Sequence, residues 1–246
     1  MGILLRRGGL GHGQIRAGQG VNSRNYRCRY GFLDAHVAVV WKEGGIATSG
    51  PGGDTLERRV LADLGGSLFS VHRLDRETCG WVLFARTQRA AARCSSAFES
   101  GNVRKVYAML AHGEIGGLAE LSSDVNGKHA HTICEVQAAG KLPGGGPAAA
   151  VLACPITGRT HQLRIHFCSA GHGLVGDARY PDPGGSPWYR GHGLFLSAVG
   201  LRIPHPEGGA DILCISPLPK KFRKMRWVPV RFMEARILHL LTYPPT

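Results

Sequence analysis

Short apolar runs separated by turn residues fill most of the chain. Residues 36–41 form a β-branched apolar run that ends at a Lys-Glu-Gly-Gly turn, which predicts a strand followed by a turn. Residues 81–85 and 105–111 have the same character and predict two more strands. We expect the ordered domain to begin near residue 35, where this pattern starts.

Two segments carry apolar side chains at helical spacing. In residues 51–64, leucine and valine recur on one helical face behind a candidate N-cap at Asp54 or Thr55. Residues 87–100 predict a second helix that a glycine closes. Residues 161–170 alternate as well as they step by helical turns, so their pattern leaves helix and strand open.

The last third of the chain returns to short apolar runs, and we find no internal repeat. Residues 194–196, 201–203 and 212–215 predict the closing strands of an antiparallel sheet. The Gly- and Pro-rich segment 140–147 predicts a surface loop. The basic residues after 220 are interleaved with Phe222 and Trp227, which fits either a solvated tail or a surface that tracks a phosphate backbone.

Charge and composition narrow the class of protein. A hydrophobic content of 43% is enough for one large core, with or without a small appendage. The net charge of +13 favours a nucleic acid partner, because each neutralised phosphate releases condensed counterions. The apolar runs are far shorter than the roughly 20 residues of a membrane-spanning helix. We therefore expect no membrane partner.

Cysteine and histidine indicate neither a disulfide framework nor a metal site. The seven cysteines are odd in number and include no C-x-x-C pair, which favours a reducing compartment. The pairs His129 with His131 and His161 with His166 lack an accompanying cysteine or carboxylate cluster. We expect no metal and no cofactor, although a metal hydrolase that uses these histidines would reveal itself by sensitivity to chelators.

The segment before Asp34 contains arginines and glycines but no acidic residue. An acid-free, Arg-bearing start is typical of mitochondrial or other organellar targeting segments, while a basic arm or a remnant RNA-binding module fits as well. A mitochondrial or other organelle matrix is the expected location, with cytoplasm and nucleus as alternatives. We divide the chain into this arm (1–34), a main domain (35–222) and a basic C-terminal tail (223–246).

Two polar segments carry the candidate chemistry. Asp75 lies between Arg73 and Arg76 just before the strand at 81–85, where flanking cations favour the charged carboxylate and a strand end can hold it in a cleft. A surface salt bridge would have the same local pattern. Residues 157–166 mix polar and apolar side chains closely, and an arginine there can pair with a buried Asp in fork geometry or hold phosphates.

Taken together and in this order, the two segments resemble the RluA-type family of RNA pseudouridine synthases. The resemblance covers residues 36–222. It rests on His72-Arg73-Leu74-Asp75-Arg76 with Thr78 and Gly80, on Gly158-Arg159-Thr160-His161-Gln162-Leu163-Arg164-Ile165-His166, and on supporting matches at Val39-Val40-Trp41-Lys42, Lys105-Val106-Tyr107, Val175-Gly176-Asp177 and Tyr180.

The resemblance implies a fold and an activity. The fold is α+β, with a mixed, mostly antiparallel sheet split by a basic active-site cleft and flanked by helices. The activity is the isomerisation of a uridine to pseudouridine in RNA, with base flipping and without a cofactor. Ribosomal RNA or transfer RNA is the expected substrate, with messenger RNA as a further class. We also expect a monomer that meets ribosomal assembly intermediates.

The resemblance also assigns roles to residues. Asp75 matches the essential carboxylate, which acts as nucleophile or as base, and Arg164 matches its paired cation. Tyr107 matches the aromatic that lies against the target base and helps remove the C5 proton. Leu163 matches the apolar side chain of the uracil pocket, and Arg73 matches the side chain that fills the gap left by the flipped nucleotide.

Three further residues, Lys42, Arg76 and His161, complete the implied RNA contacts. The chain departs from the family pattern at Cys79, where Ser is usual, at Glu43, where Pro is common, and at Ser197, where His is common. None of these changes removes a catalytic group. They mark a divergent member, so a non-catalytic RNA-binding or ribosome-assembly factor with the same fold is the second hypothesis.

Overall fold

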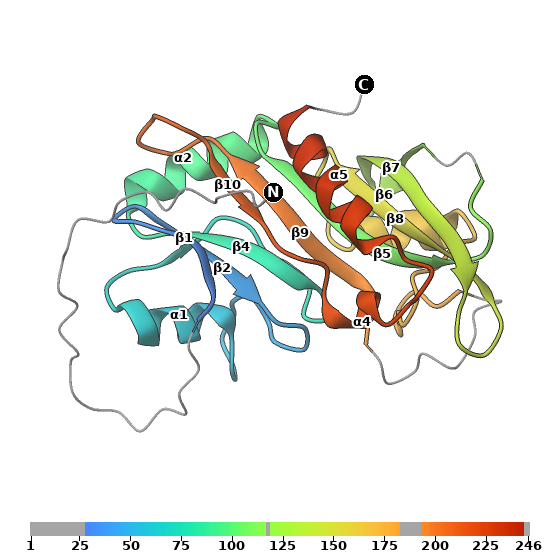
Figure 1. The fold of residues 1–246 in the computed structure, drawn as a ribbon. Helices are drawn as coiled ribbons and strands as arrows, with labels where there is room; N and C mark the ends of the chain where they lie inside the picture. The colour runs from blue at the N-terminus through green and yellow to red at the C-terminus, as the bar shows by residue number, and fades with distance from the viewer. Residues whose placement is uncertain (1–27, 117–118, 183–192, 244–246) are drawn as a thin grey trace, which may run out of the picture.

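The computed structural model describes residues 28–116, 119–182 and 193–243. The candidate targeting segment or RNA-binding arm therefore lies almost entirely outside the described residues. Within these ranges the chain forms one ten-stranded sheet with helices on both faces (Figure 1). The predicted α+β fold with a mixed, mostly antiparallel sheet is confirmed.

The ten strands lie between Tyr30 and Ile215. They are β1 (Tyr30–Leu33), β2 (Val37–Lys42), β3 (Phe69–Ser70), β4 (Cys79–Ala85), β5 (Arg104–His112), β6 (Glu120–Val125), β7 (Lys128–Lys141), β8 (Pro147–Pro155), β9 (Leu196–Ile203) and β10 (Ile212–Ile215). Their order in the sheet is β1-β2-β4-β9-β5-β8-β7-β6, with β3 on β4 and β10 on β9. Every described pair is antiparallel except β4 with β9.

The parallel contact of β4 with β9 joins the two halves of the sheet. It pairs Cys79 with Ser197 and Gly80 with Ala198. Gly80 has φ +142°, and a Cβ at this position would lie 2.4 Å from the Ala198 carbonyl oxygen. Only glycine allows the two backbones to approach this closely. The loop that carries Asp75 enters β4 beside this junction.

Five helices cover the sheet in the described residues. They are α1 (Leu56–Leu64), α2 (Gln88–Glu99), α3 (Gln162–Ser169), α4 (Lys220–Arg223) and α5 (Val230–Thr242). The N-caps of α1 and α2 are Thr55 and Thr87, whose hydroxyls accept backbone N–H bonds at 3.2 and 3.1 Å. Both predicted helices are confirmed. No helix in the described ranges is long and apolar enough to cross a bilayer.

The structure also resolves the ambiguous patterns. Residues 162–169 are helical, and the run at 201–203 belongs to the same strand, β9, as Leu196, the last residue of the run at 194–196. The Gly- and Pro-rich segment is shorter as a loop than expected, because β7 continues to Lys141 and β8 begins at Pro147. Its glycines form a tight hairpin turn between two long strands.

The side chains of β5 alternate between two cores. Val106 and Ala108 face the core that α5 covers, whereas Tyr107 and Met109 face the core that contains Leu163 of α3. Helix α5 packs on β9, β5 and β8 (Figure 1). Tyr107 and α3 therefore share one face of the sheet, and α5 covers the opposite face.

The C-terminal segment differs from the basic tail that we expected. Four residues of α5 are buried in the main core, namely Met233, Ile237, Leu240 and Leu241. Lys221 is partly buried, and its ammonium group donates to the Leu194 carbonyl and lies 5.0 Å from the centre of the Phe195 ring. The apolar face of α5 packs the C-terminal segment onto the core, although basic residues precede the helix.

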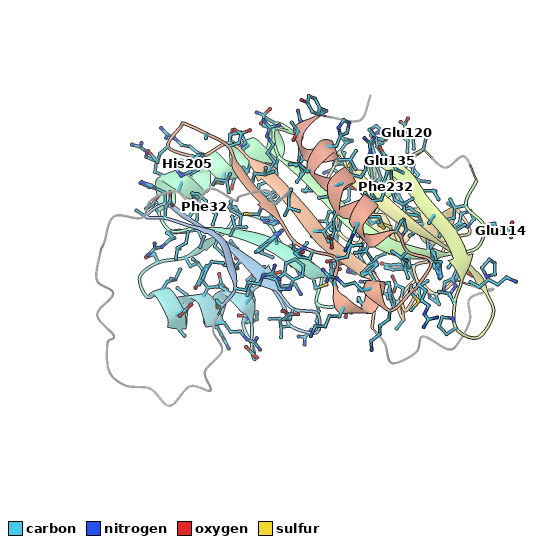
Figure 2. All side chains as sticks on the ribbon, in the orientation of Figure 1. Phe32, Glu114, Glu120, Glu135, His205 and Phe232 are labelled. Carbon is cyan, nitrogen blue, oxygen red and sulfur yellow. The ribbon has the colours of Figure 1, made fainter. Side chains whose placement is uncertain are left out.

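At one end of the molecule, Phe32 and His205 lie side by side (Figure 2). Their ring centroids are 6.0 Å apart in an edge-on arrangement. His205 Nε2 also lies 2.7 Å from a carboxylate oxygen of Asp34. These contacts tie β1 to the loop between β9 and β10.

Candidate active site

The backbone around Asp75 is held by residues from the first half of the sheet. The Thr48 hydroxyl accepts the Leu74 N–H at 3.1 Å and donates to the Leu74 carbonyl at 2.9 Å. The Thr78 N–H donates to the Asp75 carbonyl at 3.1 Å, which closes a turn over the next two residues. The position of the Asp75 Cα is thus determined on both sides.

Lys42 occupies a different place from the one expected of an RNA contact. Its side chain is fully buried, and its ammonium group donates to the carbonyls of Ile46, Arg76 and Glu43 at 2.8, 3.0 and 3.1 Å. These three acceptors match its three N–H bonds. Burial lowers the pKa of Lys42 to about 8. Lys42 therefore anchors the loop after Asp75 and has no donor left for RNA.

Arg164 in α3 reaches two carboxylates at once. Its Nε and Nη2 donate to the two oxygens of Asp177, each at 2.7 Å, and its Nη1 lies 3.4 Å from Asp75 Oδ2. Nη1 is also 3.5 Å from the exposed carboxylate of Glu77. We predicted a fork between an arginine and a buried Asp, and the Asp that takes the fork is Asp177. Asp75 receives the remaining side of the guanidinium.

Asp177 is the hub of this arrangement. Besides the fork, its Oδ1 accepts the backbone N–H groups of Arg179 and Tyr180 at 2.9 and 3.1 Å. Burial alone would disfavour the charge on Arg164, but the hydrogen bonds and the charge of Asp177, together with Asp75, raise the pKa of Arg164 above its ordinary value. The cation beside Asp75 is therefore fixed both in position and in charge.

His161 faces the other oxygen of Asp75. Its Nε2 lies 3.6 Å from Asp75 Oδ1, and its Nδ1 is 3.0 Å from the Tyr180 hydroxyl. The residue precedes α3 in the left-handed region, with φ 59° and ψ 21°. We expected His161 to contact RNA. The structure places it against the carboxylate, with its side chain only 14% exposed.

Tyr107 lies across the junction of the two sheet halves. Ala198 of β9 is paired with Gly80 of β4 on one side and with Tyr107 of β5 on the other. The Tyr107 ring packs against the core that includes Leu74 and against the core that includes Leu163. Burial, followed by the negative charge of Asp75, raises the pKa of Tyr107. The predicted trio of Asp75, Arg164 and Tyr107 is thus brought together.

The remaining predicted contacts differ in exposure. Arg73 and Arg76 are exposed on the loop that carries Asp75, whereas Leu163 is 5% exposed inside the core that Tyr107 lines. No ion pair of 4.0 Å or less joins Arg73 or Arg76 to another described residue. Among the residues that the structure describes, no group of three or more His, Cys, Asp and Glu side chains could hold a metal ion.

Two departures from the family pattern are direct neighbours. The Cys79 thiol donates to the Ser197 hydroxyl at 3.3 Å, and the two residues pair across the parallel contact of β4 with β9. Both side chains are buried. A histidine in place of Ser197 would need more room at this close approach, so the small side chains at the two positions fit each other.

Three residues of the site were not among our predicted contacts, namely Asp177, Tyr180 and Thr48. The first two match the family pattern, which assigns them no role. The available signal was an acidic residue directly after an apolar Val-Gly pair, because a carboxylate in such a setting needs strong donors when it is buried. Thr48 gave no comparable signal.

Comparisons with known proteins show which sequences this chain is similar to. Residues 36–169 match the family model described as RNA pseudouridylate synthase. The chain is 32% identical over 215 residues to the Ribosomal large subunit pseudouridine synthase C of Vibrio vulnificus, covering 79% of this chain and 67% of that protein. It is also 32% identical over 200 residues to the Dual-specificity RNA pseudouridine synthase RluA of Yersinia pestis, covering 74% and 94%.

Solved structures give the same result for the fold. Human RNA Pseudouridylate Synthase Domain Containing 1 superimposes with a TM-score of 0.68 at 26% identity, over 79% of this chain and 86% of that one. Human RNA Pseudouridylate Synthase Domain Containing 4 has a TM-score of 0.63 at 23% identity and supports the fold alone. The chain spans about two thirds of the length of the Vibrio relative.

Proposed function

The chain belongs to the RNA pseudouridylate synthase family, whose members are isomerases that act on RNA, and we propose that Asp75 is its catalytic carboxylate. The observation that supports this role most directly is the pairing of both Asp75 oxygens. Oδ2 faces the fixed cation of Arg164 and Oδ1 faces His161. The side chain remains 19% exposed, so a substrate can reach it.

The reaction sets three requirements for the site. The N1–C1′ bond of uridine breaks, the uracil turns while it is held, and a C5–C1′ bond forms before C5 loses its proton. Such chemistry needs a carboxylate near the ribose or base, a pocket that retains the uracil, and a proton acceptor. We assign these roles to Asp75, to the apolar cluster that includes Leu163, and to Tyr107.

The raised pKa of Tyr107 limits how it can act. At neutral pH its side chain is a neutral phenol, which can lie against the base as an apolar ring. A neutral hydroxyl accepts the C5 proton only if it passes its own proton on. Asp75, whose negative charge acts on Tyr107, is the neighbouring carboxylate that can receive the phenol proton.

For the substrate, we infer an RNA of the large ribosomal subunit. The Vibrio relative is named for that subunit, while the Yersinia RluA is named as dual-specific. A target uridine must leave its stack, which costs a few kcal/mol and favours loops or partly assembled RNA. Exposed Arg73 is well placed to enter the vacated position, and Arg76 to contact phosphate.

The same reasoning leads us to propose assembly intermediates of the subunit as the natural substrate and a monomer as the working form. Packed ribosomal RNA leaves few uridines free to flip, whereas an intermediate leaves more. Light scattering of the chain alone and with an RNA fragment would give the stoichiometry. A dimer in both samples would contradict the monomer.

The deciding experiment compares wild type with Asp75→Asn on large-subunit RNA, with pseudouridines mapped by sequencing and RNA binding measured in parallel. The substitution keeps the shape of the side chain and removes its charge. We expect the modification to disappear while the RNA still binds. If the same pseudouridines were found with Asp75→Asn, the protein would instead be a non-catalytic RNA-binding factor. The presence of all three assigned groups argues against that alternative.

A further inference from the structure

Two side chains, which we call the two arms of the site, face the two carboxylate oxygens of Asp75. Arg164 forms one arm and faces Oδ2 at 3.4 Å. His161 forms the other and faces Oδ1 at 3.6 Å, while its opposite ring nitrogen lies 3.0 Å from the hydroxyl of Tyr180. A row of polar contacts therefore runs from Tyr180 through His161 toward the carboxylate.

We propose that Tyr180 and His161 act in series as positioning residues that aim Oδ1 of Asp75, an inference that rests on the proposed catalytic role of this carboxylate. The Tyr180 hydroxyl donates to Nδ1, which keeps the proton of the neutral imidazole on Nε2. The Nε2–H then points at Oδ1. Binding of RNA shortens the 3.6 Å separation to a hydrogen bond, as catalytic contacts often tighten in the substrate complex.

The groups around the His161 ring keep it neutral, so the position of its one proton decides how it interacts with Asp75. Burial lowers the pKa of His161, and the cations of Arg164 and Arg179 act in the same direction against the charges of Asp75 and Asp177. The ring is therefore neutral near neutral pH and has a single N–H to place. With that proton on Nδ1, a lone pair would face the carboxylate and repel it.

The backbone supports the same role. His161 adopts the left-handed conformation, which residues other than glycine seldom occupy and which persists where the surroundings enforce it. Its carbonyl accepts the Ile165 N–H at 2.9 Å, so α3 holds the residue in place. The strained position directs the ring toward Asp75.

Both arms originate at the same carboxylate. Asp177 takes the fork of Arg164 and also accepts the backbone N–H of Tyr180 at 3.1 Å. The Tyr180 ring also lies 5.3 Å from the Arg164 guanidinium, so only the loss of the hydroxyl, with the ring kept, leaves the arginine pair intact. The substitution Tyr180→Phe therefore tests the second arm alone.

The test measures the single-turnover rate and the RNA dissociation constant of Tyr180→Phe, His161→Gln and the double variant, on a large-subunit RNA fragment that wild type converts. Tyr180→Phe removes one hydrogen bond and should slow turnover about fivefold without weakening RNA binding. The amide nitrogen of a glutamine can replace Nε2–H and needs no tautomer partner. In the His161→Gln background, Tyr180→Phe should therefore have no further effect.

Two control variants separate positioning from folding. His161→Asn suits the left-handed backbone but reaches only the place of Nδ1, so it should lose about tenfold to a hundredfold in rate. Tyr30→Phe removes a tyrosine hydroxyl that donates to Asp63 at 2.6 Å, away from the site, and should keep the wild-type rate.

The outcomes distinguish this inference from the proposed function. A wild-type rate for Tyr180→Phe, or an equal loss in the wild-type and His161→Gln backgrounds, overturns the positioning role while Asp75→Asn remains inactive. If the Asp75→Asn variant converts RNA like wild type, the proposed function itself fails. A fivefold loss that disappears in the His161→Gln background supports the series.

Discussion

Arg164 and Asp177 form a two-pronged ion pair in which both N–O distances are 2.7 Å and the arginine side chain is only 3% exposed. The fork uses two of the three nitrogens of the guanidinium. The third nitrogen is held 3.4 Å from Asp75. The separation between the proposed catalytic carboxylate and its cation is therefore set by a second carboxylate, deeper in the fold.

Asp177→Asn should lower the free energy of unfolding by ~3 to 5 kcal/mol, because it leaves the buried charge of Arg164 without its main partner. Urea unfolding measures the change. Asp211→Asn is the matched control, since Arg202 and Asp211 are also 2.7 Å apart but are each about a third exposed. The control should lose ~1 kcal/mol or less. Equal losses at the two sites would contradict the buried role of Asp177.

Lys42→Met should lower stability by at least ~2 kcal/mol, because three backbone carbonyls lose their buried donor. Turnover should also fall as the loop after Asp75 loosens, while the dissociation constant for RNA stays unchanged. Arg73→Ala should do the reverse, with weaker RNA binding and stability within ~0.5 kcal/mol of wild type. Weaker RNA binding by Lys42→Met at unchanged stability would restore Lys42 as an RNA contact.

His72 should make the fold sensitive to acid. Burial, with the charge of Lys105, lowers the pKa of His72 to about 3, and its Nε2 accepts the Leu83 N–H at 2.8 Å. An unfolded histidine has a pKa of ~6.5, so between those values the unfolded chain binds a proton that the folded chain does not. Its contribution is fully present above pH 6.5 and declines toward pH 3, by up to ~1.4 kcal/mol per pH unit.

The measurement for His72 is urea unfolding at several values between pH 4 and 7, for wild type and His72→Gln. Glutamine can accept the same N–H but does not titrate, so the variant should show a shallower pH dependence. The carboxylates contribute equally to both proteins and cancel in the difference. Parallel curves for the two proteins would show that His72 is not held neutral.

Gly80→Ala should separate β4 from β9. The new Cβ would meet the Ala198 carbonyl oxygen at 2.4 Å, in addition to the cost of a positive φ. We expect a loss of ~3 kcal/mol or more and no turnover, measured by thermal unfolding and pseudouridine formation. Gly45→Ala is the control, because Gly45 has φ +94° but a Cβ there would meet no atom within 4 Å, and it should lose only ~1 kcal/mol.

Local patterns predicted the elements whose apolar side chains are buried. Strand β4 is buried throughout, so its sequence is an apolar run, and α1 has Gly65 as its C-cap, so its end is marked by a glycine. The hairpin of β6 with β7 was missed, because β6 is an exposed edge strand with a mainly polar sequence. Its Asn126-Gly127 turn, with φ of 53° and 72°, carried the available signal.

Resemblance predicted which residues meet at the site but not which side chains hold them in place. Asp75, Arg164 and Tyr107 are far apart in the chain, and no local pattern could have joined them. The partner of the arginine fork, Asp177, depends on burial that only the folded chain reveals. The burial of Lys42 against three backbone carbonyls likewise depends on the folded chain, since its place in the sequence does not reveal these acceptors.

The place of β9 in the sheet has a consequence for the newborn chain. This strand lies between β4 and β5, both of which leave the ribosome before it. Until residue 203 emerges, β5 has one unpaired edge, and so does β4 except at Phe84 and Ala85, which pair with β3. Contacts between residues so far apart in the chain form slowly. During translation, the incomplete and aggregation-prone sheet is therefore exposed for longest at the position where the catalytic groups will meet.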